Sequence, residues 1–441
     1  MATDSFVLPE RPYRLANVNV PHIMLDSAII PDERRHLLAS VDIEVDAEGN
    51  VRRVVSNVNK RQQTDGLATI DMLGRQVWAG LVDVHAHLDK AYTWSRAPNS
   101  EGTLSGARSA AKKDRSHPWS AEDVSSRMEF AIRCALAHGT AGLRTHIDSQ
   151  FGRALPSWPV FQMLQNRWLS QIELQGVATL GVSKLAGDYG DRVCEIAKSH
   201  NAKALGPVIY RSEELEGEIL RSFALAEKYG LDLDFHVDET DDPAAEGLRE
   251  IAKLALARRF KGRIVCGHAC SLSVQDSVRA QNTIAIVRDA GIGVVCLPSS
   301  NLFLQDRSHA TPRWRGVTLV RELAAAGVPV AVAGDNASDA FNPFADFDLV
   351  DAFRDAVRLA HLDQPSIESW LGAISSTPAI MAGMTRASGR ISEGSPANFM
   401  IFQGRAVREV LARCGRDRIV VHKGRVSKIE LPSFTELDGA S

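Results

Sequence analysis

The chain has 441 residues, too many for one small core, and can hold one large barrel with an appendage or two to three domains. It carries 51 Lys and Arg against 54 Asp and Glu, a formal net charge of −3. This balance gives no basic surplus of the kind that binds nucleic acid, and no apolar run is long enough to cross a membrane. We therefore expect neither a nucleic-acid nor a membrane partner.

The N-terminal residues and the cysteines indicate a cytoplasmic protein. Residues 1–20 contain Pro9, Glu10, Arg11 and Arg14, which do not fit a signal peptide. The six cysteines are irregularly spaced, as is typical of free thiols in a reducing compartment. Cys266 and Cys270 flank His268 and could bind a metal, but buried small side chains are the simpler interpretation.

Residues 11–74 predict a small β unit. Residues 15–20 and 41–45 alternate apolar and polar side chains, the period-two pattern of strands. Residues 46–50 have turn chemistry and lead into a third strand at 51–55.

From residue 75 to 392 the pattern changes to strands alternating with helices, which is typical of parallel β/α architecture. The expected strands are 76–88, 140–149, 172–181, 202–211, 231–238, 262–270, 291–299 and 329–336. Helices are expected between them, for example from a cap at Ser120 to about residue 138, with a last long helical stretch over 344–382. Eight strands with intervening helices predict a (β/α)₈ TIM-like barrel.

After residue 391 the chain returns to β character. Residues 397–402 and 419–426 read as strands, the second with a Lys-Gly turn at 423–424. We expect residues 1–74 and 393–441 to form one small discontinuous β-sandwich domain beside the catalytic barrel.

The first barrel strand ends in a histidine pair, His85 and His87. Side chains two residues apart on a strand point to the same side about 6.6 Å apart, so both imidazoles can reach one point. Imidazole suits zinc, iron or another late divalent metal. Two core or surface histidines could fall at the same spacing, but further candidate ligands follow downstream.

Three more strands end in metal-binding or acid/base side chains. These are His236, with Glu239 three residues later, then His268, then Asp335. The C-terminal ends of all strands meet at one mouth of such a barrel. Three imidazoles and a carboxylate would leave room for water on a divalent cation. The cation would lower the pKa of that water toward about 7. Glu239 could then move a proton from water to a leaving amine, while Asp335 also accepts a proton.

These residues resemble a known family, the amidohydrolase superfamily, in its branch of cytosine deaminase and related aminohydrolases. Residues 144–148 (Arg-Thr-His-Ile-Asp), 235–239 with 241–242, and 334–336 (Gly-Asp-Asn) follow in the order found in that branch. The terminal β segments resemble its β-sandwich, so the resemblance covers nearly the whole chain.

The resemblance implies hydrolytic deamination of a nitrogen heterocycle, such as a cytosine-like nucleobase, with release of ammonia. It assigns the metal to His85, His87, His236 and Asp335. Glu239 would be the proton shuttle and His268 the group that polarises the substrate, so the catalytic set is Glu239, His268 and Asp335. Zinc or iron is expected, and manganese is possible.

Two-metal members of the superfamily carry a carbamylated lysine at the end of the fourth strand. Residues 204–210 contain no lysine, and Lys203 lies at the opposite end of that strand. We therefore expect one divalent metal per chain.

The substrate positions depart from those of cytosine deaminases. Asn336 stands where a second aspartate is found, and residues 178–182 offer no side-chain amide where a glutamine is found. Phe341 could stack on a flat ring or pack beneath a loop, and His146 could contact substrate or be a core histidine. The expected substrate contacts are Asn336, His268, Leu180, Phe341 and His146.

Alternative activities remain open. Residues 296–300 and Asp339 also resemble triazine-ring N-alkylamine hydrolases of the same branch. Cyclic-amide hydrolysis is a further possibility, which the absent lysine disfavours. A non-enzymatic scaffold would usually have lost metal ligands. The expected partner is a small heterocyclic substrate, and the chain could form a homo-oligomer.

Overall fold

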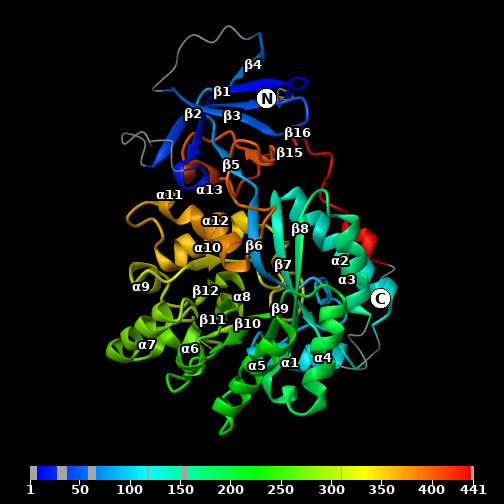
Figure 1. Cartoon of the computed structure of the whole chain (residues 1–441), viewed down its shortest axis with the longest axis vertical. Coiled ribbons are helices and arrows are strands. Elements are labelled where there is room, and N and C mark those ends of the chain that lie inside the picture. The colour runs from blue at the N-terminus through cyan, green and yellow to red at the C-terminus, as the bar shows by residue number, and fades with distance from the viewer. Residues whose placement is uncertain are drawn as a thin grey trace.

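The computed structural model describes residues 7–26, 37–57, 66–116, 119–150, 156–308 and 310–438. A β-rich part lies at one end of the molecule and a barrel wrapped by helices at the other (Figure 1). None of the helices in these described ranges is both long enough and apolar enough to cross a membrane.

The barrel has eight parallel strands, each hydrogen-bonded to the next in chain order. The strands are β6 Leu81–Ala86, β7 Thr140–Asp148, β8 Glu173–Gly181, β9 Ala204–Val208, β10 Asp232–Val237, β11 Ile264–His268, β12 Gly293–Cys296 and β13 Val330–Val332. The ring closes just beyond the last strand, where the Asp335 N–H donates to the His85 carbonyl at 2.9 Å. The predicted (β/α)₈ barrel is confirmed.

Helices cover the outside of the barrel. They are α1 Leu104–Asp114, α2 Ala121–Ala137, α3 Ser157–Arg167, α4 Asp188–Ser199, α5 Leu215–Tyr229, α6 Gly247–Arg258, α7 Ser277–Asp289, α8 Pro298–Leu304, α9 Val320–Ala325, α10 Leu349–Ala360, α11 Ile367–Trp370 and α12 Ser376–Ala382. Short 3₁₀ turns are η1 His22–Met24, η4 Val182–Leu185, η5 Cys270–Val274, η6 Leu371–Ile374 and η7 Phe434–Leu437. Ser120 caps α2 as predicted, since its hydroxyl accepts from the Asp123 N–H.

Two sequence expectations about elements were wrong. The strand expected over 76–88 is split at Gly80: β5 Val77–Ala79 joins a different sheet, and only β6 belongs to the barrel. A Cβ at Gly80 would lie 2.7 Å from the Ala141 side chain, so this crossing needs a glycine. The long helix expected over 344–382 is three helices, because His361 leaves α10 in a left-handed conformation with φ of 50°.

The terminal segments form two four-stranded sheets. The first contains β1 Tyr13–Pro21, β2 Leu38–Val45, β3 Val51–Ser56 and β4 Ala68–Asp71; the second contains β5, β14 Phe399–Ile401, β15 Ile419–His422 and β16 Arg425–Val426. Helix α13 Val407–Ala412 lies between β14 and β15. The two ends of the chain meet where β5 pairs with β14 and where the Val51 N–H donates to the Ser395 carbonyl. The limits of a separate domain at 74 and 393 stay a prediction.

A buried polar layer crosses the barrel interior. Arg144 on β7 donates to the carboxylate of Asp234 at 2.9 Å and twice to the Gln175 amide oxygen, at 2.8 and 3.0 Å. Its guanidinium also donates to the Ala382 carbonyl of α12 at 2.8 Å, which ties the barrel to the helix beneath it. Because side chains alternate along a strand, His146, two residues beyond Arg144, also faces the interior, closer to the C-terminal mouth.

Candidate metal centre and surrounding site

The predicted metal-binding side chains converge at the C-terminal mouth. His85 Nε2 lies 3.1 Å from His236 Nε2, and His236 Nε2 lies 3.2 Å from His87 Nε2. Asp335 Oδ1 lies 3.2 Å from His87 Nε2 and 3.7 Å from His85 Nε2. Three strand ends, of β6, β10 and the segment after β13, thus direct four ligand-type atoms toward one point.

The spacing of these atoms fits a divalent cation. With metal–nitrogen distances of about 2.1 Å, tetrahedral ligands lie about 3.4 Å apart, close to the separations seen here. Asp335 Oδ1 is buried and has no hydrogen-bond partner among the described residues. Burial lowers the pKa of His85, His87 and His236 well below the usual range, so each ring is neutral and offers a lone pair. The four side chains could hold one metal.

The backbone is irregular around these side chains. The register of β6 against β7 shifts between Asp83 and Ala86, the stretch that carries His85. The carboxylate of Asp83 accepts from the backbone N–H of His85 at 3.2 Å and of Gly334 at 3.2 Å. The backbone of Asp335 has a φ of 64°. Residues other than glycine rarely adopt this left-handed conformation, and those that do cluster at functional sites.

His146 lies beneath the convergent histidines. Its ring centroid is 4.0 Å from that of His85, and its Nε2 lies 3.4 Å from Asp234 Oδ1. The His87 ring hydrogen-bonds to the backbone of His146. A hydrogen bond of this kind fixes the orientation of a ligand imidazole. His146 therefore supports the site from below.

Glu239 and His268 lie together beside the convergent atoms. His268 Nδ1 is 3.6 Å from Glu239 Oε1 and 3.2 Å from the amide nitrogen of Asn301 on α8. An amide nitrogen only donates, so Nδ1 accepts and the proton of a neutral His268 sits on Nε2. That Nε2 has no protein partner in the described part of the chain. Burial raises the pKa of Glu239.

The loop after β13 carries the candidate substrate residues Asn336 and Phe341. Asn336 is 3% exposed, and its Nδ2 donates to Asp339 Oδ2 at 2.6 Å. Lys90 Nζ lies 4.3 Å from the Phe341 ring centroid. Burial raises the pKa of Asp339 to about 6, against the opposing charge of Lys90.

Leu180 does not fit the expected substrate contact. A Cβ at Gly176 would meet Trp158 and Phe161 of α3, so this face of β8 points to the helices. Leu180 lies four residues further on the same face and is buried in the main hydrophobic core. The side chain of Thr179, one residue earlier, points to the barrel interior instead.

Three residues near the mouth were missed from the sequence: Lys90, Asn301 and Arg108. Lys90 directly follows the His-x-His strand, a signal that was available. Arg108 lies on α1, which the sequence did not predict, with its guanidinium carbon 4.7 Å from the Tyr210 ring centroid. Its charge acts on Glu239, as does that of Lys90.

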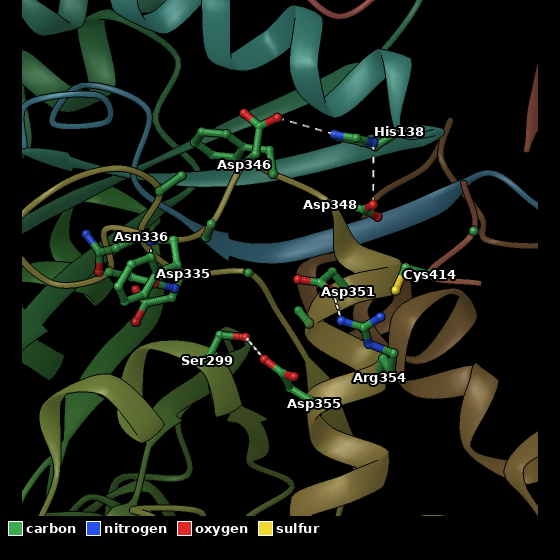
Figure 2. Close-up of a pocket in the computed structure, with 18 of the residues that line it drawn as sticks. His138, Ser299, Asp335, Asn336, Asp346, Asp348, Asp351, Arg354, Asp355 and Cys414 are labelled. Carbon is green, nitrogen blue, oxygen red and sulfur yellow. Dashed lines mark hydrogen bonds and ion pairs between the residues drawn. The ribbon is translucent and has the colours of Figure 1, made fainter. Parts of the chain in front are cut away.

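A cavity of about 830 Å³ adjoins the outer side of the loop after β13. Figure 2 shows Asp335 and Asn336 at one edge of it, with Ser299 bonded to Asp355 below and His138 between Asp346 and Asp348 above. The loop 334–348 after β13 supplies the largest share of its lining, and α8, α10 and the segment 414–418 supply most of the rest. Of the four predicted metal ligands, Asp335 alone lines it, so the cavity adjoins the candidate metal centre at that residue.

Comparison with known proteins identifies the family. A model described as the amidohydrolase family matches residues 183–428. A pterin deaminase from Rhizobium rhizogenes is 39% identical over 439 residues, covering 98% of each chain. The chain belongs to the amidohydrolase family. The matched range of the amidohydrolase model begins beyond His85 and His87, and includes His236, Glu239, His268 and Asp335.

A further relative and a solved structure are similar to much of the chain. An N-isopropylammelide isopropyl amidohydrolase from Pseudomonas sp. is 23% identical over 292 residues, 64% of this chain and 68% of that protein. The solved structure of 5-methylcytosine deaminase from Klebsiella pneumoniae, liganded with 5-fluorocytosine, superposes with a TM-score of 0.79 and 22% identity. It covers 96% of this chain and 99% of that chain, and shows the same fold.

Proposed function

We propose that this amidohydrolase is a metal-dependent deaminase of a nitrogen heterocycle, with an amino-oxo ring of the pterin type as substrate. The observation that carries the proposal is the convergence of His85, His87, His236 and Asp335 beside the buried pair Glu239 and His268. The 39% identity to a pterin deaminase over nearly the whole chain supports the substrate class.

The reaction replaces a ring C–NH₂ with C=O and releases ammonia. The water oxygen goes to the ring carbon, one of its protons leaves with the amine and the other ends on the ring nitrogen. Metal bound by His85, His87, His236 and Asp335 would supply Lewis-acid chemistry, making hydroxide available near neutral pH.

The protein's own groups handle the protons and the developing charge. Glu239 takes a proton from the attacking water and returns it to the amine, because protonated amine is the better leaving group. Its raised pKa suits both steps, since the carboxyl must hold and release a proton near neutral pH. His268 presents Nε2–H as a donor that polarises the ring, with Asn301 holding its tautomer. Asp335 can also accept a proton from the water.

The proposal is tested by an ammonia-release screen of metal-loaded protein over pterins, pyrimidines, purines and triazines. We expect ammonia and the corresponding oxo product, with pterins hydrolysed best. Absence of ammonia release from every amino-substituted ring would contradict deamination.

A second candidate is hydrolysis of an N-alkylamine on a triazine ring. The similarity to an N-isopropylammelide isopropyl amidohydrolase favours it. Release of the alkylamine from an N-alkyl triazine, without ammonia from any amino ring, would support this activity instead.

We predict one equivalent of metal per chain at full activity. The end of β9 carries no lysine that could bridge two metals, and Lys203 lies before its first residue. Metal analysis of protein titrated with zinc, iron or manganese should reach maximal activity at one equivalent. A requirement for two equivalents would contradict the single centre.

Four further expectations stay predictions. They are the identity of the metal, a cytoplasmic location, homo-oligomer formation and the absence of a nucleic-acid partner.

A further inference from the structure

Asn336 and Asp339 form a buried pair in the loop after β13. They are 3% and 1% exposed, and Asn336 Nδ2 lies 2.6 Å from Asp339 Oδ2. The other carboxylate oxygen, Oδ1, accepts from the backbone N–H groups of Phe341 at 2.8 Å and Asn342 at 3.2 Å. The loop therefore fixes Asp339, and Asp339 in turn fixes one end of the Asn336 amide.

The chemistry of this pair determines which way the amide faces. An ionised carboxylate only accepts hydrogen bonds, so the nitrogen of Asn336 must face Asp339. The amide oxygen of Asn336 is then turned away from Asp339. Asn336 directly follows Asp335, whose Oδ1 lies 3.2 Å from His87 Nε2, so the Asn336 amide is attached next to the candidate metal centre.

We propose that Asp339 is a positioning residue that makes Asn336 a hydrogen-bond acceptor toward the substrate ring. The inference rests on the proposed function and on the expectation that Asn336 contacts the heterocycle. An acceptor at that position selects rings that present an N–H donor, such as the lactam edge of an amino-oxo ring. It rejects rings that present a bare nitrogen lone pair there, since two acceptors would face each other without a proton.

The variant Asp339→Asn tests this inference at nearly constant shape. The new amide oxygen can still accept from Phe341 and Asn342, so the loop is retained. The new amide nitrogen faces Asn336 as a donor, which obliges Asn336 to turn its oxygen inward and present its nitrogen to the ring. The ring preference should therefore reverse.

The probes are pterin, which carries an N–H in its lactam, and 2-amino-4-methoxypteridine, in which the same nitrogen is an acceptor. In the wild type we expect kcat/KM to favour pterin by about 10- to 100-fold, the usual effect of a mismatched buried hydrogen bond. Asp339→Asn should lower or reverse that ratio, mainly through KM, with metal content unchanged.

The exchanged pair Asn336→Asp with Asp339→Asn provides the rescue. Here the asparagine at 339 donates to the carboxylate at 336, which again offers an acceptor to the ring, and the pterin preference should return.

Asp306→Asn is the matched control. Its carboxylate likewise accepts from two successive backbone N–H groups, those of Arg313 and Trp314, but in an exposed loop.

Selective ¹⁵N labelling of asparagine gives a readout independent of turnover. The Asn336 side-chain signal, identified by its loss in Asn336→Asp, should show one amide proton shifted by the carboxylate in the wild type and not in Asp339→Asn. An unchanged ring preference in Asp339→Asn, or no recovery in the exchanged pair, would overturn the inference. Failure of the proposed function looks different: the wild type hydrolyses neither ring, while the NMR signal still reports the amide orientation.

Discussion

Replacing Glu239 with glutamine is expected to lower kcat by about 10²- to 10⁴-fold, with the metal still bound and KM little changed. The glutamine amide has the shape of the carboxyl group but can neither take a proton from water nor return it to the amine. Glu239 lies 3.6 Å from His268 and outside the convergent ligand atoms, so its loss should affect chemistry and not metal binding. Metal content and steady-state kinetics of the same preparation check both parts.

Glu246→Gln is the matched control for this variant. Glu246 follows Glu239 by seven residues and pairs with Arg279 at 2.8 Å, where both side chains are partly exposed to solvent. The same loss of charge there should leave kcat within about twofold of the wild type, because exposed ion pairs contribute little to the stability of the fold. If Glu239→Gln loses the metal, Glu239 is a ligand, and if its turnover is near normal, Glu239 is not the proton shuttle.

The barrel and its polar strand ends could be predicted from sequence because both follow from periodicity. Parallel strands place their C-terminal ends at one mouth, so His85, His236, His268 and Asp335 had to come together once their strands were recognised. That reasoning needed no side-chain geometry. It located the residues of the centre, which the structure places within a few ångströms of one another.

Leu180 shows where a family resemblance alone fails to place a residue. The face of a strand changes with every residue, so an error of one position exchanges barrel and helix sides. The contacts beside Gly176 place Leu180 toward α3, and only tertiary packing could reveal this. Helix α1 was missed for another reason: Ala107, which packs against Leu304 and Ala340, is its only buried residue, so α1 lacks the long apolar face that made α2 predictable.

The hydrogen-bond donor that orients His268 also could not be predicted from the sequence. Asn301 reaches His268 from α8, 33 residues away, and nothing in its local pattern distinguishes it from a helix residue. The left-handed φ of 71° at His268 and 64° at Asp335 depends on the closed barrel, because such strain persists only where the surroundings impose it.

Replacing His236 with alanine is expected to abolish turnover and to lower metal affinity by more than 100-fold. Removing a group that merely supports a ligand commonly costs about 10- to 100-fold, so removing a ligand should cost more. His236 is the most informative choice, because its Nε2 lies 3.1 Å from that of His85 and 3.2 Å from that of His87. Metal analysis after dialysis should find little metal in this variant.

Removal of the metal with a chelator gives a second test of His236 as a ligand. Metal that binds only the folded protein raises its melting temperature, so chelation should lower the Tm of the wild type and leave that of His236→Ala unchanged. His200→Ala is the control, since His200 caps the C-terminal end of α4, where its Nδ1 lies 2.8 Å from the Ile196 carbonyl oxygen and 3.1 Å from Ser199 Oγ. It should keep the metal, the activity and the chelator response. A His236→Ala protein with full metal and a normal chelator response would remove His236 from the centre, and with it the three-histidine site on which the deaminase mechanism depends.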